Sequence, residues 1–327
     1  MMIGNQPSIS VLIPTYNYAR YLPEAIESVL AQDLQDFELL VVDDCSTDNT
    51  AEVVRPFCSR DARIRFSVNS SNVGMVNNWN LCLEQARGEY IKFLFGDDKF
   101  FHSQALSRML ALMQANPSAI LAASARAILD ENSKVIDVYK DLPEGCHDGR
   151  KIITAILLED GKNLAGEPSA VMFRKADARR GFNTAYKQIV DVEMWFHLLE
   201  KGNLAYTREP LCAFRSHSRQ QTEVNTASGL GFREHAVFFG NYACQDWLPR
   251  YVLLPWLFHF RRRLSRESTA ASPELVECER RAIDRMGKGW RWRYLIYCLR
   301  YRIAKPFSNL CHSIQKRLFR RRYRIAT

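Results

Sequence analysis

The first 130 residues alternate short apolar runs with segments whose apolar residues recur at helical spacing. Apolar runs that end at polar or turn residues are typical of buried strands, and apolar positions three or four apart are typical of amphipathic helices. The expected strands are Ile9–Ile13, Phe37–Val42, Ile64–Val68, Tyr90–Phe95 and Ala119–Ala127. The expected helices are Tyr21–Ala31, a helix capped by Thr47–Thr50, Met75–Ala86 ending at Gly88 as a left-handed cap, and Ser103–Ala115. This alternation predicts an α/β fold, a mostly parallel central sheet flanked by helices.

The alternation becomes irregular after about Val135. Three later segments are expected to extend the same sheet and its helices: Val171–Arg174, the helix Val192–Lys201 and Leu204–Phe214. Beyond Gly229 the chain predicts helices rich in Arg and Trp. We therefore expect a catalytic α/β domain over residues 1–245 and a basic, aromatic-rich helical region over residues 246–327.

Charge is distributed unevenly along the chain. Residues 248–327 contain 20 Lys and Arg against 5 Asp and Glu, whereas residues 1–247 contain 25 against 31. Four aromatic residues lie beside cationic ones in the basic part: Trp256, Trp290, Trp292 and Tyr294. This composition suits an amphipathic segment on an anionic membrane surface, and it also suits a helical subdomain or an oligomer interface with a solvated basic face. A nucleic-acid partner is not expected, because no nucleic-acid-binding module is recognisable.

Cysteine usage and hydropathy bear on the compartment. The nine cysteines show no CxxC or other metal-ligand spacing, which favours a reducing cytoplasm over a disulfide framework. The N-terminus has no signal-peptide pattern, and the longest apolar run, Tyr251–Phe260, is too short to span a bilayer. We expect a cytoplasmic protein that is soluble or peripheral at the inner face of the plasma membrane.

Polar clusters follow three of the expected strands: Pro14–Asn17, Asp43–Asp48 and Gly96–Asp98. Ligands of open α/β sheets bind at the carboxyl ends of the strands, where these clusters would gather at least four carboxylates. A divalent metal with a nucleotide diphosphate would balance their charge, because hard cations prefer carboxylate and phosphate oxygens.

The ordered motifs PTYN, VVDDCSTDNT, NVG and ARGEYIKFLFGDD resemble the family 2 glycosyltransferases with the GT-A fold, over roughly residues 7–220. The resemblance implies inverting transfer of a sugar from a nucleotide-diphosphate sugar, with Mn²⁺ or Mg²⁺. It also implies a saccharide or lipid-linked acceptor in bacterial cell-surface polysaccharide or glycolipid assembly.

The resemblance assigns the nucleotide pocket to the first two clusters. The turn Pro14, Thr15, Tyr16 and Asn17 would line the base and ribose. Asp44 would accept from the imide N–H of uracil or thymine, which favours a UDP- or dTDP-sugar. Asp43 would serve the ribose or order the loop.

Asp97 and Asp98 correspond to the DXD-type element of the family. Asp98 would bind the metal, and Asp97 would lie between the metal and the donor ribose or sugar. Each of these acids could instead cap a helix or a turn, and for Asp48 we favour that interpretation.

Three further elements lie in the second half. Asp191 aligns with the family's catalytic base, with Glu193 as a second candidate, although Asp191 could also simply cap its helix. Arg215 and His217 resemble an RxH element, which implies phosphate neutralisation by Arg215 and metal or diphosphate contact by His217. Glu167 lies where members of the family shape the sugar pocket.

The chain departs from the family pattern at two positions. Phe95 stands where many members have an additional Asp, and Trp79 stands where many have an Arg before Asn80. The first departure predicts a metal held by fewer protein oxygens, and the second leaves the choice of nucleotide open.

Other functions remain open from sequence. A nucleotidyltransferase on a similar sheet would favour a Gly- and Lys-rich triphosphate loop, which PTYNYAR does not supply. A processive polysaccharide synthase would carry a QxxRW element and membrane spans. A non-catalytic membrane-surface protein on this fold would be expected to lack Asp98 or Asp191, and both are present.

Overall fold

The computed structural model describes residues 6–217, 220, 230–267 and 272–301. Contacts within the chain divide it into two units, residues 1–156 with 162–235, and residues 157–161 with 236–327. The predicted domain division near residue 245 stays a prediction. The basic segment 302–327 lies outside the described residues.

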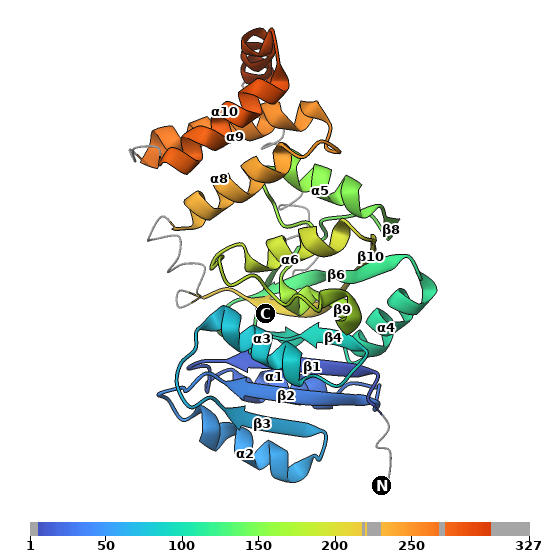
Figure 1. Cartoon of the computed structure of the whole chain (residues 1–327). Helices are drawn as coiled ribbons and strands as arrows, with labels where there is room; N and C mark the ends of the chain where they lie inside the picture. Colours follow the sequence, from blue (N-terminus) through green and yellow to red (C-terminus); the bar gives the residue numbers. More distant parts are fainter. Residues whose placement is uncertain (1–5, 218–219, 221–229, 268–271, 302–327) are drawn as a thin grey trace. The chain divides into compact units, whose positions relative to one another are not determined.

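A ten-stranded mixed sheet forms the centre of the first unit. Its strands are β1 (Ile9–Thr15), β2 (Phe37–Asp43), β3 (Ile64–Val68), β4 (Tyr90–Phe93), β5 (Lys99–Phe100), β6 (Ala119–Leu129), β7 (Val135–Tyr139), β8 (Gly145–His147), β9 (Val171–Arg174) and β10 (Asn203–Arg215). Their spatial order is β3-β2-β1-β4-β9-β6-β10-β5, with β7 paired to β6 and β8 to β10 (Figure 1). The predicted α/β fold is confirmed, and each predicted strand is present.

The first part of the sheet is parallel. β1 pairs with β2 and β4, and β2 pairs with β3, all in parallel. The register places Thr15 opposite Asp43, so the carboxyl ends of β1 and β2 meet at one edge. A parallel sheet buried on both faces requires continuous apolar strands, and every residue of β1 and β2 is buried.

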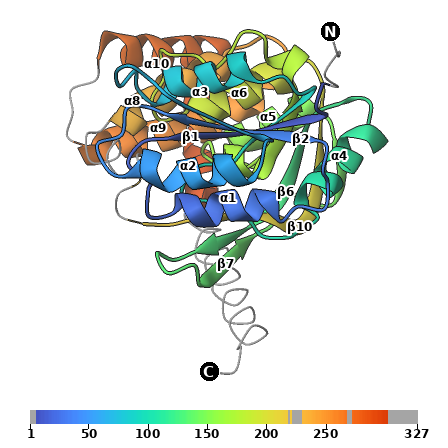
Figure 2. The ribbon, with the colours of Figure 1, turned by 90° about the horizontal axis from the view of Figure 1, so that it is seen from below.

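Helices cover both faces of the sheet. They are α1 (Leu22–Leu30), α2 (Thr50–Arg60), α3 (Met75–Gln85), α4 (Ala105–Ala115), α5 (Gly149–Leu158) and α6 (Val190–Leu199). Figure 2 shows α1 and α2 on one side of β1 and β2, with α3 and α6 on the other. On the α1 side, Ile9, Val11 and Ile13 share a buried cluster with Ile26 and Val29.

The second part of the sheet differs from a simple continuation of the parallel order. β9 lies between β4 and β6 and is antiparallel to both, whereas β10 is parallel to β6. β5 and β8, of two and three residues, and the exposed β7 were not predicted, because such short or exposed strands leave no clear periodicity.

Gly88 has a different role from the predicted left-handed cap. The helix before it ends at Ala86 in an extended conformation. A Cβ atom on Gly88 would lie 2.4 Å from the backbone nitrogen of Ser10. Glycine is therefore required here for close approach of two backbones.

The second unit is helical in its described part. It contains the end of α8 (Leu230–Ala243), α9 (Leu253–Glu267), α10 (Pro273–Met286) and a helix over 290–301. Trp256 is only 6% exposed and stacks on Phe260 with ring centroids 5.1 Å apart. It belongs to the interior of this unit, so it does not contribute to the predicted aromatic surface. Within the described residues, the structure contains no helix that is both long and apolar enough to cross a bilayer.

Candidate active site

The carboxyl ends of β1 and β2 hold the first group of predicted residues. Pro14 and Thr15 are the last residues of β1, and the backbone N–H of Asp44 donates to the carbonyl of Thr15 over 2.9 Å. Tyr16, just beyond the strand, is 44% exposed and accessible to a ligand. The predicted turn and the acidic loop after β2 therefore lie side by side.

Asn17 joins these two loops. It adopts a left-handed backbone with φ of 59°. Its side-chain oxygen accepts from the backbone N–H of Thr47 over 2.8 Å, and its own N–H donates to the hydroxyl of Ser46 over 2.8 Å. Ser46 also donates to the carboxylate of Asp43, whose pKa is raised by burial. Asn17 and Asp43 thus order the loop.

The Asp44 carboxylate is 2% exposed and organises the loop that leads into α3. Oδ1 accepts from the side-chain amide of Asn69 and the N–H of Val73, over 2.9 and 2.8 Å. Oδ2 accepts from the N–H of Gly74 over 2.9 Å. A carboxylate oxygen can accept two hydrogen bonds, so Oδ2 retains capacity for a ligand N–H.

The acidic pair after β4 is the most constrained part of the site. Asp98 is 1% exposed, and its Oδ1 accepts from the backbone N–H of Arg215 over 2.9 Å. Its Oδ2 is buried and has no hydrogen-bond partner among the described residues. Burial and the charge of Asp97 raise the pKa of Asp98 well above its usual range. A cation is the natural compensation for such an oxygen.

Asp97 faces His217 and two tyrosines. Its Oδ2 lies 3.0 Å from His217 Nε2, and both side chains are buried. The His217 ring contacts Tyr18 edge-on and Tyr21 at a tilt, with centroids 6.2 and 5.5 Å away. Burial and the carboxylates of Asp97 and Asp98 raise the pKa of Tyr18. His217 of the RxH element thus lies beside the acidic pair, and its contact with a metal or the diphosphate stays a prediction.

Arg215 differs from its predicted surroundings. Its side chain is 1% exposed, and each guanidinium nitrogen donates to a protein oxygen. Contact with a phosphate would require these hydrogen bonds to be exchanged, so that role stays a prediction.

Asp191 lies in the first turn of α6 and is partly exposed. Its Oδ2 accepts from the side-chain amide of Asn163 over 2.9 Å. Burial raises the pKa of Asp191 to about 7. Glu193, the second candidate base, is held in two 2.7 Å hydrogen bonds by Arg180 and is 6% exposed. The two acids therefore have separate surroundings: Glu193 is paired with Arg180, whereas Asp191 is partly exposed.

Glu167 connects the two catalytic candidates electrostatically. Its charge contributes to the raised pKa of both Asp98 and Asp191. Its carboxylate pairs with Arg126, which also donates to Asp141 over 2.6 Å. Glu167 thus interacts electrostatically with both Asp98 and Asp191, which come from separate stretches of sequence.

The protein provides only part of a metal site. Within the described residues, no group of three or more His, Cys, Asp and Glu side chains is arranged to hold a metal ion. Asp98 Oδ2 and Thr15 Oγ1 are nevertheless buried oxygens without hydrogen-bond partners among those residues. A Cβ on Gly96 would lie 3.2 Å from Thr15 Oγ1, so this hydroxyl is adjacent to the acidic turn. These atoms fit a cation that takes its other ligands from diphosphate and water.

The two departures from the family pattern contact each other. The rings of Trp79 and Phe95 lie 4.9 Å apart at an angle of 30°. Phe182 meets Trp79 edge-on at 5.2 Å. An aromatic contact thus occupies the place where the family pattern would bring two charged residues.

One buried charged residue near the acidic pair, Lys92, was not among the predicted site residues. Lys92 of β4 is fully buried, and its ammonium donates to the carbonyls of Ser169 and Phe93. Burial lowers the pKa of Lys92 to about 8. The Ser169 hydroxyl accepts from the N–H of Phe95 over 3.1 Å. A lysine inside the apolar run YIKFLF was the available signal, because buried lysines require specific partners.

Comparison with known proteins decides the family. The family described as Glycosyl transferase family 2 matches residues 10–180, more than half of the chain. This chain is a family 2 glycosyltransferase. It is 31% identical to the uncharacterised protein MT1568 of Mycobacterium tuberculosis, over 66% of this chain and 70% of that protein. It is 28% identical to TuaG of Bacillus subtilis, named as a predicted teichuronic acid biosynthesis glycosyltransferase, over 63% and 77% of the two chains.

Solved structures show that the glycosyltransferase has the GT-A fold. The structure of Staphylococcus aureus TarS residues 1–349 in complex with UDP-GlcNAc matches with a TM-score of 0.61 and 20% identity, over 79% of this chain and 73% of that one. The mannosyltransferase PcManGT of Pyrobaculum calidifontis, in complex with GDP-Man and Mn²⁺, matches with a TM-score of 0.57 and 17% identity, over 94% and 88%. The family assignment therefore favours glycosyl transfer over the nucleotidyltransferase alternative.

Proposed function

We propose that this glycosyltransferase is an inverting, metal-dependent enzyme. It would transfer a sugar from a nucleotide-diphosphate sugar, preferably a UDP- or dTDP-sugar, to a saccharide or lipid-linked acceptor. One observation carries the proposal: Asp98 has a buried oxygen with no hydrogen-bond partner among the described residues, while Asp191, which Glu167 also influences, has a pKa of about 7. The nucleotide-sugar complexes of TarS and PcManGT support such a donor.

The roles of the acids follow from their surroundings. The acceptor hydroxyl oxygen forms a bond to the anomeric carbon while the bond from that carbon to the diphosphate breaks. Asp191 accepts the hydroxyl proton, and a pKa near 7 suits a general base at neutral pH. Asp98 and Asp97, with His217 beside them, would hold the metal, which supplies positive charge to the departing diphosphate. The remaining acceptor capacity of Asp44 Oδ2 would serve an imide N–H of the base.

We propose peripheral association with an anionic membrane at the cytoplasmic face, through residues 248–327. In helix 290–301, four exposed apolar side chains recur at helical spacing: Trp292, Leu295, Ile296 and Leu299. Three arginines and no acidic residue accompany them in that helix. The sequence of 302–327 adds eight Lys and Arg and no Asp or Glu. An apolar stripe flanked by cations is the composition of an interfacial helix. A role in cell-surface polysaccharide synthesis is supported by the likeness to TuaG.

The donor site is tested by thermal unfolding with UDP, dTDP or GDP, each with and without Mn²⁺. At a ligand concentration a hundredfold above Kd, binding adds about 2.7 kcal/mol of stability, which raises Tm by roughly 5–10 °C. We expect UDP or dTDP to give a shift that grows with Mn²⁺. Asp98→Asn should remove the Mn²⁺-dependent part. If no nucleotide shifts Tm under any condition, the assignment of the donor site is wrong.

A further inference from the structure

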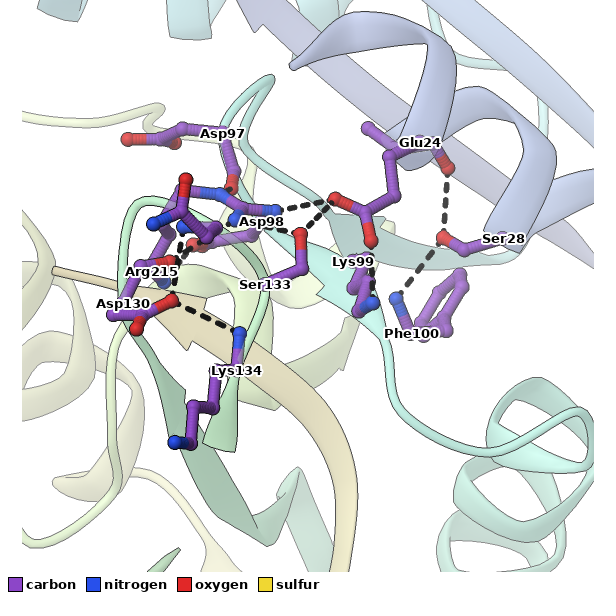
Figure 3. Close-up of polar contacts among 12 residues, drawn as sticks. Glu24, Ser28, Asp97, Asp98, Lys99, Phe100, Asp130, Ser133, Lys134 and Arg215 are labelled. Atoms are coloured by element: carbon purple, nitrogen blue, oxygen red, sulfur yellow. Dashed lines mark hydrogen bonds and ion pairs between the residues drawn. The ribbon is translucent and has the colours of Figure 1, made fainter. Parts of the chain in front are cut away.

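The guanidinium of Arg215 lies at the centre of a buried polar network (Figure 3). Nε donates to the carbonyl of Asp97 over 2.8 Å, and Nη1 donates to the hydroxyl of Ser133 over 2.9 Å and the carbonyl of Asp130 over 3.2 Å. Nη2 donates to Glu24 Oε2 over 2.6 Å. The side chain is thus directed into the protein, below the acidic turn.

The main chain of the same residue holds the second acid of the pair. The N–H of Arg215 donates to Asp98 Oδ1, which leaves Oδ2 as the oxygen without a hydrogen-bond partner among the described residues. Arg215 therefore donates two hydrogen bonds to the acidic turn, one to the carbonyl of Asp97 and one to the carboxylate of Asp98. These contacts determine which oxygen of Asp98 is available.

Glu24 of α1 connects Arg215 to other parts of the fold. Its Oε2 also accepts from the hydroxyl of Ser133 over 2.7 Å, and its Oε1 pairs with Lys99, the residue that follows the acidic pair. The Arg215 guanidinium further lies 4.7 Å from the ring centroid of Tyr21. The ion pair between Arg215 and Glu24 thus joins four parts of the fold: helix α1, the turn after β4, the β6–β7 hairpin and the end of β10.

We propose that Arg215 and Glu24 are positioning residues that orient the Asp97–Asp98 turn, so that Asp98 Oδ2 faces the divalent cation. Arg215 acts through the two acids and not by touching the diphosphate. This inference rests on the proposed metal-dependent function. Residues that orient metal ligands in this way typically change metal affinity about 10- to 100-fold when they are substituted.

The test is a Mn²⁺ titration of the whole protein with saturating UDP, followed by thermal shift, with metal-free UDP affinity measured in parallel. Glu24→Gln keeps the side-chain shape and removes the charge. We expect it to raise the half-saturating Mn²⁺ concentration about tenfold or more, with UDP affinity in the absence of metal unchanged. The matched control is Glu27→Gln on the same helix, where the Glu27 side chain is 61% exposed. This control should match the wild type.

Two milder variants guard against loss of folding. Ser133→Gly removes the hydroxyl and accommodates the left-handed φ of 64° at this position. Arg215→Lys keeps the charge but loses the forked contacts. Both should shift the Mn²⁺ requirement in the same direction as Glu24→Gln.

The outcomes separate this inference from the proposed function. If Mn²⁺ does not change the Tm of the wild-type protein with UDP, both the proposed metal-dependent function and the positioning role are wrong. A wild type that responds to Mn²⁺, with Glu24→Gln and Ser133→Gly within twofold of it, would overturn the positioning role alone. Weaker metal-free UDP binding by Arg215→Lys, without a change in the Mn²⁺ requirement, would instead show that Arg215 touches the diphosphate.

Discussion

At the scale of single residues, the site consists of carboxylates in contrasting surroundings. Asp44 accepts three hydrogen bonds from backbone and amide donors, whereas Asp98 keeps one buried oxygen without a partner among the described residues. Asp191 is partly exposed and has a raised pKa. Identical side chains can therefore serve in loop order, cation binding and proton transfer, because hydrogen bonding and burial set the properties of each.

The raised pKa of Asp191 predicts a pH dependence. A base must be ionised to accept a proton, so kcat/KM should rise with pH and level off above about 7. Asp191→Asn should abolish transfer and keep nucleotide binding. Asp177→Asn, at a side chain that is 33% exposed, is the matched control and should remain active. An active Asp191→Asn enzyme would disprove the base assignment.

The same shift predicts how stability changes with pH. The folded pKa of Asp191 lies above its ordinary value of about 4, so ionisation in the folded state is unfavourable. The protonated Asp191 side chain therefore contributes to the free energy of unfolding in full below pH 4, and this contribution is lost as the pH rises through 7. Relative to wild type, Asp191→Asn should therefore gain stability between pH 4 and 8 in urea unfolding. A constant difference would contradict the raised pKa.

At the scale of elements, aromatic side chains join α3 to the end of β4. Trp79 and Phe95 are in contact, and Asn80 binds the backbone of Phe182 through two hydrogen bonds of 2.9 and 2.7 Å. The turn that carries the acidic pair begins at Phe95, since the N–H of Asp98 donates to its carbonyl. The aromatic contact thus helps to fix where the acidic turn starts.

A double-mutant cycle tests this connection. Trp79→Leu and Phe95→Leu should show a coupling free energy of about 0.5–1.5 kcal/mol in denaturant unfolding, as aromatic pairs do. The control pair is Trp79→Leu with Phe57→Leu, because Phe57 belongs to α2 on the other side of the sheet. Its effects should add within about 0.5 kcal/mol. Additivity in both cycles would mean that the contact between the two rings contributes no specific coupling free energy.

At the scale of the whole molecule, charge is separated along the chain. The part that contains the donor-site candidates is mildly acidic, and residues 248–327 are strongly basic. Of the aromatic residues in the described part of the basic region, Trp256 is buried, whereas Trp292 is 72% exposed and Tyr251 is 58% exposed. Membrane association would therefore depend on few apolar side chains and many cations.

The proposed membrane contact predicts the behaviour of point variants. Trp292→Ser combined with Leu299→Ser should weaken binding to phosphatidylglycerol vesicles about tenfold or more, since each apolar side chain contributes on the order of 1–2 kcal/mol when buried. Val276→Ser on α10 is the control, because Val276 and Leu299 are each 52% exposed. Binding by wild type should decrease with salt. Equal binding by the double variant and wild type would exclude this surface.

Local patterns in the sequence were sufficient for the longer buried elements of the first half and for the acidic clusters. Apolar runs and helical spacing predicted β1 to β4 within one or two residues, because buried strands and amphipathic helices impose local periodicities. The motifs that follow these strands led to the correct family, and the carboxyl ends of parallel strands meet by geometry.

Only the tertiary structure decided how distant residues share one site. Arg215 lies 191 positions from Glu24, and Glu167 acts on both Asp98 and Asp191. The insertion of β9 between β4 and β6, the hydrogen-bond partners of Lys92 and the close approach at Gly88 likewise have no local signal that specifies them. Ion pairing, burial and backbone contact depend on which segments pack together. A single sequence does not state which distant segments do so.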